Sequence, residues 1–165
     1  LMDMLKRAVT FEDSDLILVW RNSVDARRSS QKPEEISRDE HESWLRNRIL
    51  RVNSEPFWVM SLGKKIVGYV RLDYFNSDQN VFTISIFVVP ECRNVGLGNQ
   101  MLVTALSSAA SNYPDSFFRA VVKNDNKSRS TPYIQMFEAE NGFLENLSIL
   151  DLLFMEGPNS INFMK

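Results

Sequence analysis

The residues with the clearest chemical potential lie in the stretch 86–98, where Arg93, Gly96 and Gly98 form the pattern Arg-x-x-Gly-x-Gly. An apolar, β-branched run precedes this pattern, and a helix-forming run, Asn99–Ser111, follows it. Helix N-termini carry unpaired N–H groups and the positive end of the helix dipole, so they bind anions. Glycine lets a phosphate approach the main chain, and Arg93 adds a fixed positive charge. The pattern therefore predicts a ligand that carries phosphate.

Two other glycine motifs are absent from the sequence. The chain has no Gly-x-x-x-x-Gly-Lys-[Ser/Thr] loop, and its Gly-x-Gly lacks the third glycine of the dinucleotide-binding motif. What remains resembles the GNAT superfamily of acetyl-CoA-dependent N-acetyltransferases. The resemblance implies that loop amides bind the CoA pyrophosphate and that the end of the preceding strand pairs with the pantetheine arm. An ordinary strand-to-helix turn is the alternative. The cofactor-binding residues that the resemblance implies are Phe87, Val88, Val89, Arg93, Asn94, Val95, Gly96, Leu97 and Gly98.

A second stretch strengthens the resemblance. Residues 121–128 and 136–143 resemble the strand, Asn-x-x-Ser turn, helix and Gly-Phe ending of the same superfamily. In its members the asparagine contacts the cofactor. The spacing to the helix is longer here than is usual, so two assignments stay open. The matching residues are Asn126 or Asn124, with Ser128 or Ser130 beside them.

The acid that would protonate the departing CoA thiolate is not where the family pattern has it. Phe137 occupies the position of a tyrosine found in many members, and a phenyl ring cannot donate a proton. Tyr133, one turn earlier in the predicted helix, is the nearest replacement. A partly buried tyrosine that packs the start of the helix is the alternative. A thiol titrates near pKa ~8.5, so the thiolate leaves with little help.

The general base is also displaced. Thr83 and Ser85 stand where many relatives carry a glutamate, and neither hydroxyl is a base at neutral pH. Asp73, His41 and Glu91 are the ionisable alternatives. Histidine has the pKa best placed to accept an ammonium proton, so His41 is the candidate base, with a helix-surface or substrate-contacting histidine as the competing interpretation.

A covalent mechanism and a metal centre are both disfavoured. Cys92 is the one cysteine, and it lies within the presumed phosphate loop, where its thiol would point away from the reacting carbon. We therefore expect direct attack of the amine on acetyl-CoA in a ternary complex. One cysteine and one histidine cannot build the usual nitrogen and sulfur metal sites. A single cysteine also suits a reducing cytoplasm.

The N-terminal third carries a finer resemblance in Trp20-Arg21-Asn22, Arg27-Arg28-Ser29-Ser30, Ile36-Ser37 and His41-x-x-Trp44-Leu45. It resembles the branch that includes the amino-sugar-nucleotide N-acetyltransferases of pseudaminic acid biosynthesis, next to the ribosomal-protein and polyamine acetyltransferases. In this branch the first two helices and their loop form much of the acceptor site. The acceptor-binding candidates are Asn22, Arg27, Arg28, His41, Asp73 and Phe75.

Each acceptor candidate has a chemical role and a structural alternative. The two neighbouring arginines can hold a nucleotide diphosphate, Asn22 a sugar hydroxyl, and Trp44 or Phe75 can stack a base. The alternative for the arginines is a solvated face. For Trp20 and Trp44 we favour core anchors of amphipathic helices, because both sit at helical spacing with other apolar residues.

Strands and helices in mixed order must position these residues. The strands are predicted at Leu5–Val9, Phe57–Leu62, Ile66–Tyr74, Val81–Val89 and Phe117–Val122. Helices are predicted after capping patterns at Thr10 and Ser37, over Asn99–Ser111, and from Thr131-Pro132 to Asn141-Gly142. Arg21–Pro33 is predicted as a loop, and Ser148–Met155 with Ser160–Met164 as a closing hairpin. The order predicts an α/β (mixed α+β) fold, which the resemblance specifies as a central mixed, largely antiparallel sheet flanked by helices.

Length and charge bound the remaining possibilities. The 165 residues predict a single domain, 1–165, long enough to bury a core. A net charge of −2 gives no case for nucleic acid as the main partner. The apolar runs are too short to span a membrane, and no signal-peptide pattern opens the sequence. Related enzymes are often dimers, so a homodimer is compatible with the resemblance, although no interface stripe stands out.

These observations predict a cytoplasmic N-acetyltransferase that uses acetyl-CoA and acts on a small-molecule amine, a nucleotide-linked amino sugar. A protein N-terminal or polyamine acetyltransferase is the enzymatic alternative. A polyamine would favour an acidic acceptor site, whereas the segment 22–28 carries more positive than negative charge. The missing tyrosine and strand glutamate keep open a catalytically silent acyl-CoA-binding protein of the same fold.

Overall fold

The computed structural model describes residues 3–30, 32–76, 80–121, 134–138 and 142–143. Its strands form one sheet in chain order. The strands are β1 (Met4–Ala8), β2 (Phe57–Leu62), β3 (Lys65–Asn76), β4 (Val81–Val88), β5 (Phe117–Val121), β6 (Ile134–Glu138) and β7 (Gly142–Phe143). Neighbouring strands are antiparallel except β4 and β5, which are parallel. The predicted mixed, largely antiparallel sheet is confirmed.

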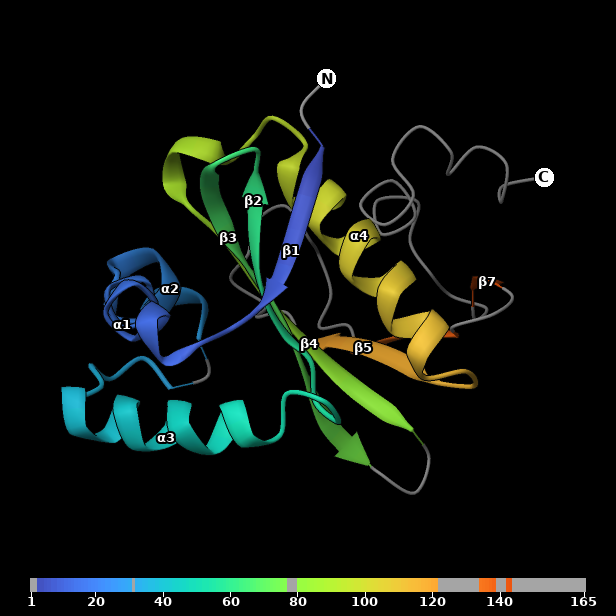
Figure 1. Cartoon of the computed structure of the whole chain (residues 1–165), viewed down its shortest axis with the longest axis horizontal. Coiled ribbons are helices and arrows are strands. Elements are labelled where there is room, and N and C mark those ends of the chain that lie inside the picture. The colour runs from blue at the N-terminus through green and yellow to red at the C-terminus, as the bar shows by residue number, and fades with distance from the viewer. Residues whose placement is uncertain (1–2, 31, 77–79, 122–133, 139–141, 144–165) are drawn as a thin grey trace.

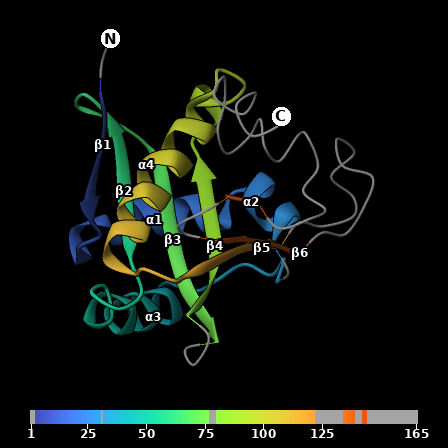
Figure 2. The ribbon, with the colours of Figure 1, turned by 90° about the vertical axis from the view of Figure 1, so that its right-hand side faces the viewer.

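Helices cover both faces of this sheet (Figure 1). They are the 3-10 turns η1 (Phe11–Asp13) and η2 (Pro90–Cys92) and the helices α1 (Ser14–Asn22), α2 (Val24–Ser29), α3 (Arg38–Leu50) and α4 (Leu97–Asn112). Helix α4 lies on one face, and α1, α2 and α3 lie on the other. Figure 2 shows α4 running along β3 and β4, in agreement with its contacts with those strands. No helix in the described part of the chain is long and apolar enough to cross a membrane.

Strand β3 shows which side chains point to each face of the sheet. Val70 and Leu72 are fully buried, and residues at alternate positions of a strand point to the same face. Tyr69 points the other way, where its ring lies 6.1 Å from that of Trp20 on α1. Arg71 and Asp73 follow Tyr69 at the same period, so the face beneath α1 and α3 carries charged groups.

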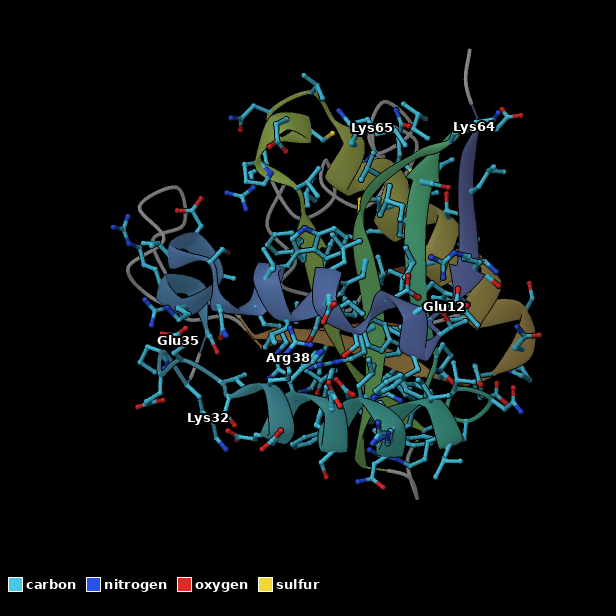
Figure 3. The ribbon with its side chains drawn as sticks, turned by 60° about the vertical axis from the view of Figure 1, so that its left-hand side comes forward. Glu12, Lys32, Glu35, Arg38, Lys64 and Lys65 are labelled. Carbon is cyan, nitrogen blue, oxygen red and sulfur yellow. The ribbon has the colours of Figure 1, made fainter. Side chains whose placement is uncertain are left out.

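A capping hydrogen bond and an ion pair position the helices on the face that carries Arg71 and Asp73. The Ser37 side chain accepts a hydrogen bond from the Glu40 amide at 3.3 Å, which starts α3 as predicted. Arg38 on α3 is paired with Asp15 on α1, and Figure 3 shows its side chain where the two helices run side by side. Together these contacts hold α3 against α1.

Two predictions of secondary structure are wrong. The segment Arg21–Pro33 is not all loop, because Ser23 accepts a hydrogen bond from the Ala26 amide and caps the short helix α2. The predicted helix of residues 131–142 is replaced over Ile134–Glu138 by strand β6, which pairs with β5. An available strand edge overrides a marginal helical pattern. The predicted closing hairpin of residues 148–164 lies outside the described residues.

Candidate functional site

Strand β4 is paired with β5 over only the first half of its length among the residues described. Val81–Ile84 pair with Phe117–Ala120, whereas Ser85–Val88 have no β5 partner among the residues described. The same half of β4 remains paired with β3, up to Val88 opposite Gly68. A strand that loses one neighbour presents backbone N–H and C=O groups on that side, and an extended ligand with amide groups can pair with them.

Gly68 holds the end of β4 in place. An ideal Cβ at Gly68 would lie 1.9 Å from the Phe87 carbonyl oxygen and 2.9 Å from the terminal methyl of Met101 on α4. Its φ of +153° also lies in the region that favours glycine. The absence of a side chain therefore lets β3, β4 and α4 meet closely at the C-terminal end of β4.

We call Ser85–Val88, which have no described β5 partner, the free half of β4. The predicted loop leads from this free half into α4. Asn94 and Gly96 have φ of 62° and 80°, and α4 begins at Leu97. Residues 94–96 are exposed, and within the described ranges none of their amides donates a backbone hydrogen bond. A Cβ at Gly96 would meet nothing within 4 Å. Exposed amides ahead of a 16-residue helix have the geometry of an anion site.

Arg93 is not directed at that open space. Its Nε donates to the Val88 carbonyl oxygen at 2.9 Å, and a terminal nitrogen lies 2.7 Å from the Asp25 carboxylate on α2. The predicted phosphate contact of Arg93 is thus replaced in this structure by a brace between the loop, β4 and α2.

Beneath α1 and α3, the charged residues Arg71 and Asp73 of β3 lie beside β4. The register places Arg71 opposite Ser85 and Asp73 opposite Thr83. Asp73 Oδ2 accepts from Arg71 Nε at 2.7 Å, and Oδ1 lies 3.0 Å from Arg48 Nε. Asp73 lies on this face, and each of its carboxylate oxygens already has a guanidinium partner.

The interpretation of His41 as the catalytic base is not supported by its position. His41 is fully buried between α3 and α1, and its Nε2 lies 2.9 Å from the Ser14 carbonyl oxygen, to which it donates. Burial lowers the pKa of the imidazole. A histidine without solvent access that is bonded to a backbone carbonyl joins two helices and cannot receive a proton from an acceptor in this conformation.

Asn22 also has a structural role in place of the predicted hydroxyl contact. Its Nδ2 donates to the Ile36 carbonyl oxygen at 2.8 Å, and its Oδ1 accepts from the Ile36 amide at 2.9 Å. Both halves of the amide side chain are therefore used. The contact ties the end of α1 to the chain that enters α3.

The remaining acceptor candidates lie at two places. Arg27 and Arg28 form the last turn of α2, the helix that carries the Asp25 partner of Arg93. Phe75, near the end of β3, is 59% exposed, and the Arg119 guanidinium lies 3.5 Å from its ring centroid. An exposed ring with a cation on one side is compatible with the predicted stacking role.

Trp20 is a core residue, as favoured from its spacing, whereas Trp44 packs against the edge of the core. Trp20 is 8% exposed and stacks on Phe87 at 5.2 Å between ring centroids. Trp44 is half-buried against Phe57, with centroids 6.1 Å apart. The Cys92 thiol is buried, which agrees with the expectation that it takes no part in acyl transfer.

Three predicted site residues lie outside the described part of the chain: Tyr133, Asn126 and Ser128. Three arginines were missed by reasoning from motifs. Arg71 and Arg119 follow from strand alternation, since each shares a face with Asp73 or Thr83. Arg21 carries no such signal, because only the packing of α1 on α3 brings it over Trp44.

The acetyltransferase (GNAT) family pattern matches residues 21–143. No curated protein sequence matches the chain.

Solved structures share the fold. One is a spermidine N-acetyltransferase from Vibrio cholerae in complex with CoA and spermine, with a TM-score of 0.67, 22% identity, and coverage of 76% of this chain and 75% of that one. Another is a ribosomal-protein α-N-acetyltransferase in complex with coenzyme A (TM-score 0.65, 16% identity, coverage 76% and 74%). A third is a ribosomal-protein-alanine N-acetyltransferase from Brucella melitensis (TM-score 0.61, 21% identity, coverage 75% and 77%).

The family match takes in the free half of β4, the exposed loop and α4 together. The chain therefore belongs to the acetyltransferase (GNAT) family and is an acetyl-CoA-dependent N-acetyltransferase.

Proposed function

We propose that this enzyme transfers the acetyl group of acetyl-CoA to a primary amine on a nucleotide-activated amino sugar. One observation carries the cofactor part of the proposal. The free half of β4, which has no described β5 partner, leads directly into exposed loop amides ahead of α4. Pantetheine amides would pair with Ser85–Val88, and the CoA diphosphate would lie on the amides of residues 94–98. Asn126 and Ser128 complete the proposed cofactor contacts.

The acceptor would approach from the face beneath α1 and α3, because Ser85 and Thr83 of β4 point to the same face as Arg71 and Asp73. Its nitrogen attacks the thioester carbonyl carbon, so a C–N bond forms as the C–S bond breaks and CoA leaves as a thiolate. The surplus proton of the amine passes to water or, through water, to Asp73. The thiolate takes a proton from Tyr133 or from solvent.

The sugar assignment is supported by the N-terminal sequence resemblance and by the basic residues near the site. Arg27 and Arg28 on α2 are within the same region as the loop, because Asp25 on that helix is paired with Arg93. Phe75 offers an exposed ring for a base. A polyamine acceptor is the rival that the spermine complex of the Vibrio cholerae structure brings forward.

The acceptor is tested by thiol release from acetyl-CoA with a panel of amines. The panel contains UDP- and dTDP-amino sugars, spermidine and peptides with free N-termini. We expect release with an amino-sugar nucleotide. Release with spermidine or peptides alone would contradict the sugar assignment. No release with any amine, together with tight CoA binding, would favour a silent acyl-CoA-binding protein.

We also propose one acetyltransferase domain over residues 1–165, a cytoplasmic location and a homodimer. The buried free thiol of Cys92 is compatible with a reducing compartment. Sedimentation of the purified chain measures the oligomeric state, and a monomer at micromolar concentration would contradict the dimer.

A further inference from the structure

We infer that the acceptor site contains an anion subsite formed by the guanidiniums of Arg21 and Arg71 beside Trp44, and that the acceptor amine carries a phosphate or carboxylate that binds there. This inference rests on the proposed function, because it names the class of acceptor for the same site. It differs from the sequence-based expectation, which assigned a diphosphate to Arg27 and Arg28.

Three elements bring this subsite together. Trp44 comes from α3, Arg21 from α1 and Arg71 from β3. The Arg21 guanidinium lies 4.3 Å from the Trp44 ring centroid, and the Arg71 guanidinium lies 5.2 Å from it. The two like charges thus share one indole ring, which orients both planar groups and limits their freedom.

The cations of this subsite exceed its anions. Asp73 is the carboxylate partner of Arg71, and it is shared with the buried Arg48. For Arg21, no carboxylate lies within ion-pair distance in the described ranges of the chain, and Glu40 and Asp73 act on its charge only from farther away. Burial and the nearby charge of Arg71 lower the pKa of the Arg21 guanidinium. A partly dehydrated cation beside another cation is costly, and a bound anion relieves that cost.

The subsite lies next to the reacting edge of β4. A terminal nitrogen of Arg71 donates to Ser85 Oγ at 3.3 Å, and Ser85 is the first β4 residue without a β5 partner among those described. Further along the same face, Arg119 Nε donates to Thr83 Oγ1 at 3.1 Å. Arg71 therefore lies beside the free half of β4, where an amine would approach the thioester, and Arg119 lies beside the adjoining paired half.

This arrangement selects among the acceptor classes of the family. A polyamine would bring two or more positive charges against Arg21 and Arg71, and like charges repel one another strongly at short range in a site that is partly shielded from water. A phosphate or carboxylate would instead accept charge-assisted hydrogen bonds from the two guanidiniums. The structure therefore assigns the enzyme an anionic acceptor.

Binding of anions to the CoA-loaded enzyme tests the subsite without requiring turnover. CoA at saturation fills the loop ahead of α4, so a second anion reports on another site. Calorimetric titration with UDP and with N-acetylglycine distinguishes a phosphate from a carboxylate. The variants are Arg21→Gln, Arg21→Lys as the charge-conserving rescue, and Lys64→Gln as the matched control at the exposed β2–β3 turn (Figure 3).

We expect at least one of the two anions to bind, and Arg21→Gln to weaken that binding by about 10- to 100-fold, as for the loss of a hydrogen bond to a charged group. Arg21→Lys should recover part of the affinity, and Lys64→Gln should leave it unchanged. The CoA dissociation constant should be the same in all four proteins. Failure of both anions to bind, or equal binding to wild type and Arg21→Gln, would overturn the subsite.

Turnover separates this inference from the proposed function. With anionic acceptors, Arg21→Gln should raise KM by about 10- to 100-fold with a smaller change in kcat. With an amino sugar that carries no phosphate or carboxylate, KM should change by less than about threefold. An equal loss with both acceptors would show a structural role and contradict the subsite. Anion binding that depends on Arg21, without acetylation of any amine, would refute the proposed function and leave the subsite standing.

Discussion

Arg48 shows how one buried side chain can position an entire site. It is 1% exposed on α3, and it donates to the carbonyl oxygens of Glu55 at 2.8 Å and Leu72 at 3.0 Å. Its Nε also lies 3.0 Å from Asp73. The guanidinium therefore connects α3, the turn before β2 and the end of β3, and it orients the Asp73 carboxylate.

Replacing Arg48 should be costly at the residue scale. Arg48→Met leaves two carbonyls without their donor and the Asp73 carboxylate without one of its ion-pair partners, so the free energy of unfolding should fall by about 3 kcal/mol. Urea unfolding followed by circular dichroism measures this loss. Arg46→Met, on the exposed face of the same helix, is the matched control and should change stability by less than about 0.5 kcal/mol. Similar values for the two variants would show that the Arg48 contacts are not a net stabilising feature.

The Arg93–Asp25 pair gives a second prediction at this scale. If Arg93 must leave Asp25 to bind the CoA diphosphate, Asp25→Asn should strengthen CoA binding severalfold, and Arg93→Ala should weaken it by about tenfold. If Arg93 only braces the loop, both variants should weaken binding slightly. Calorimetric titration of CoA into the two variants distinguishes these outcomes, and unchanged affinity in both would remove Arg93 from the cofactor site.

At the scale of elements, α1 and α3 are joined by a titratable contact. His41 donates to the Ser14 carbonyl, and burial lowers its pKa from the ordinary value of 6.5. The unfolded chain therefore binds a proton at a higher pH than the folded protein. The stabilisation from neutral His41 is complete above that ordinary value and is lost as the pH falls below it.

This contact predicts a pH-dependent stability. The urea midpoint of the wild type should fall between pH 7.5 and pH 5.0, and the fall should be smaller in His41→Gln, which keeps a donor but does not titrate. Both proteins carry the same carboxylates, so the difference between them isolates His41. An identical fall in wild type and variant would mean that the histidine does not control the joint.

The junction of β3 with β4 is the second element-scale feature. A methyl group at Gly68 would overlap the Phe87 carbonyl oxygen and the Met101 side chain, whereas one at Gly96 would enter open space. Gly68→Ala should thus cost about 3 kcal/mol of stability by forcing the strands apart. Gly96→Ala, which suffers only from its positive φ, should cost about 1 kcal/mol. Equal losses in urea unfolding would contradict the close packing at Gly68.

At the scale of the whole molecule, the two faces of the sheet carry different kinds of side chain. The α4 side is an apolar core that includes Leu72, Met101 and Ala105. The other side carries the arginines of the proposed acceptor face. The free half of β4 lies where the two meet, so a ligand there contacts elements from both faces. Ligand binding should therefore stabilise the fold as a unit.

Mass action sets the size of that stabilisation. Acetyl-CoA at a hundred times its dissociation constant should raise the free energy of unfolding by about 2.7 kcal/mol. 3′-Dephospho-CoA, which keeps the diphosphate and pantetheine, should do the same at the same multiple of its own dissociation constant. Urea titration with and without each ligand measures both shifts. No shift with either ligand would contradict a cofactor site at the free half of β4.

The sequence alone determined the features that depend on short-range chemistry. Strand Phe57–Leu62 was predicted with the bounds that the structure has, because its apolar residues and the following Gly-Lys-Lys turn are local signals. The Ser37 cap and the loop 93–98 were likewise readable, since a cap needs a partner only three residues away. The family resemblance rests on the same local patterns.

The tertiary structure alone decided which polar side chains lie on the proposed acceptor face. His41 bonds Ser14 and Asn22 bonds Ile36, so both left the predicted site for partners that helix packing selected. Arg21 and Arg71 come together over one tryptophan although they lie far apart in sequence. A buried polar group must find a hydrogen-bond partner, and which partner is in reach depends on long-range packing that no local pattern encodes.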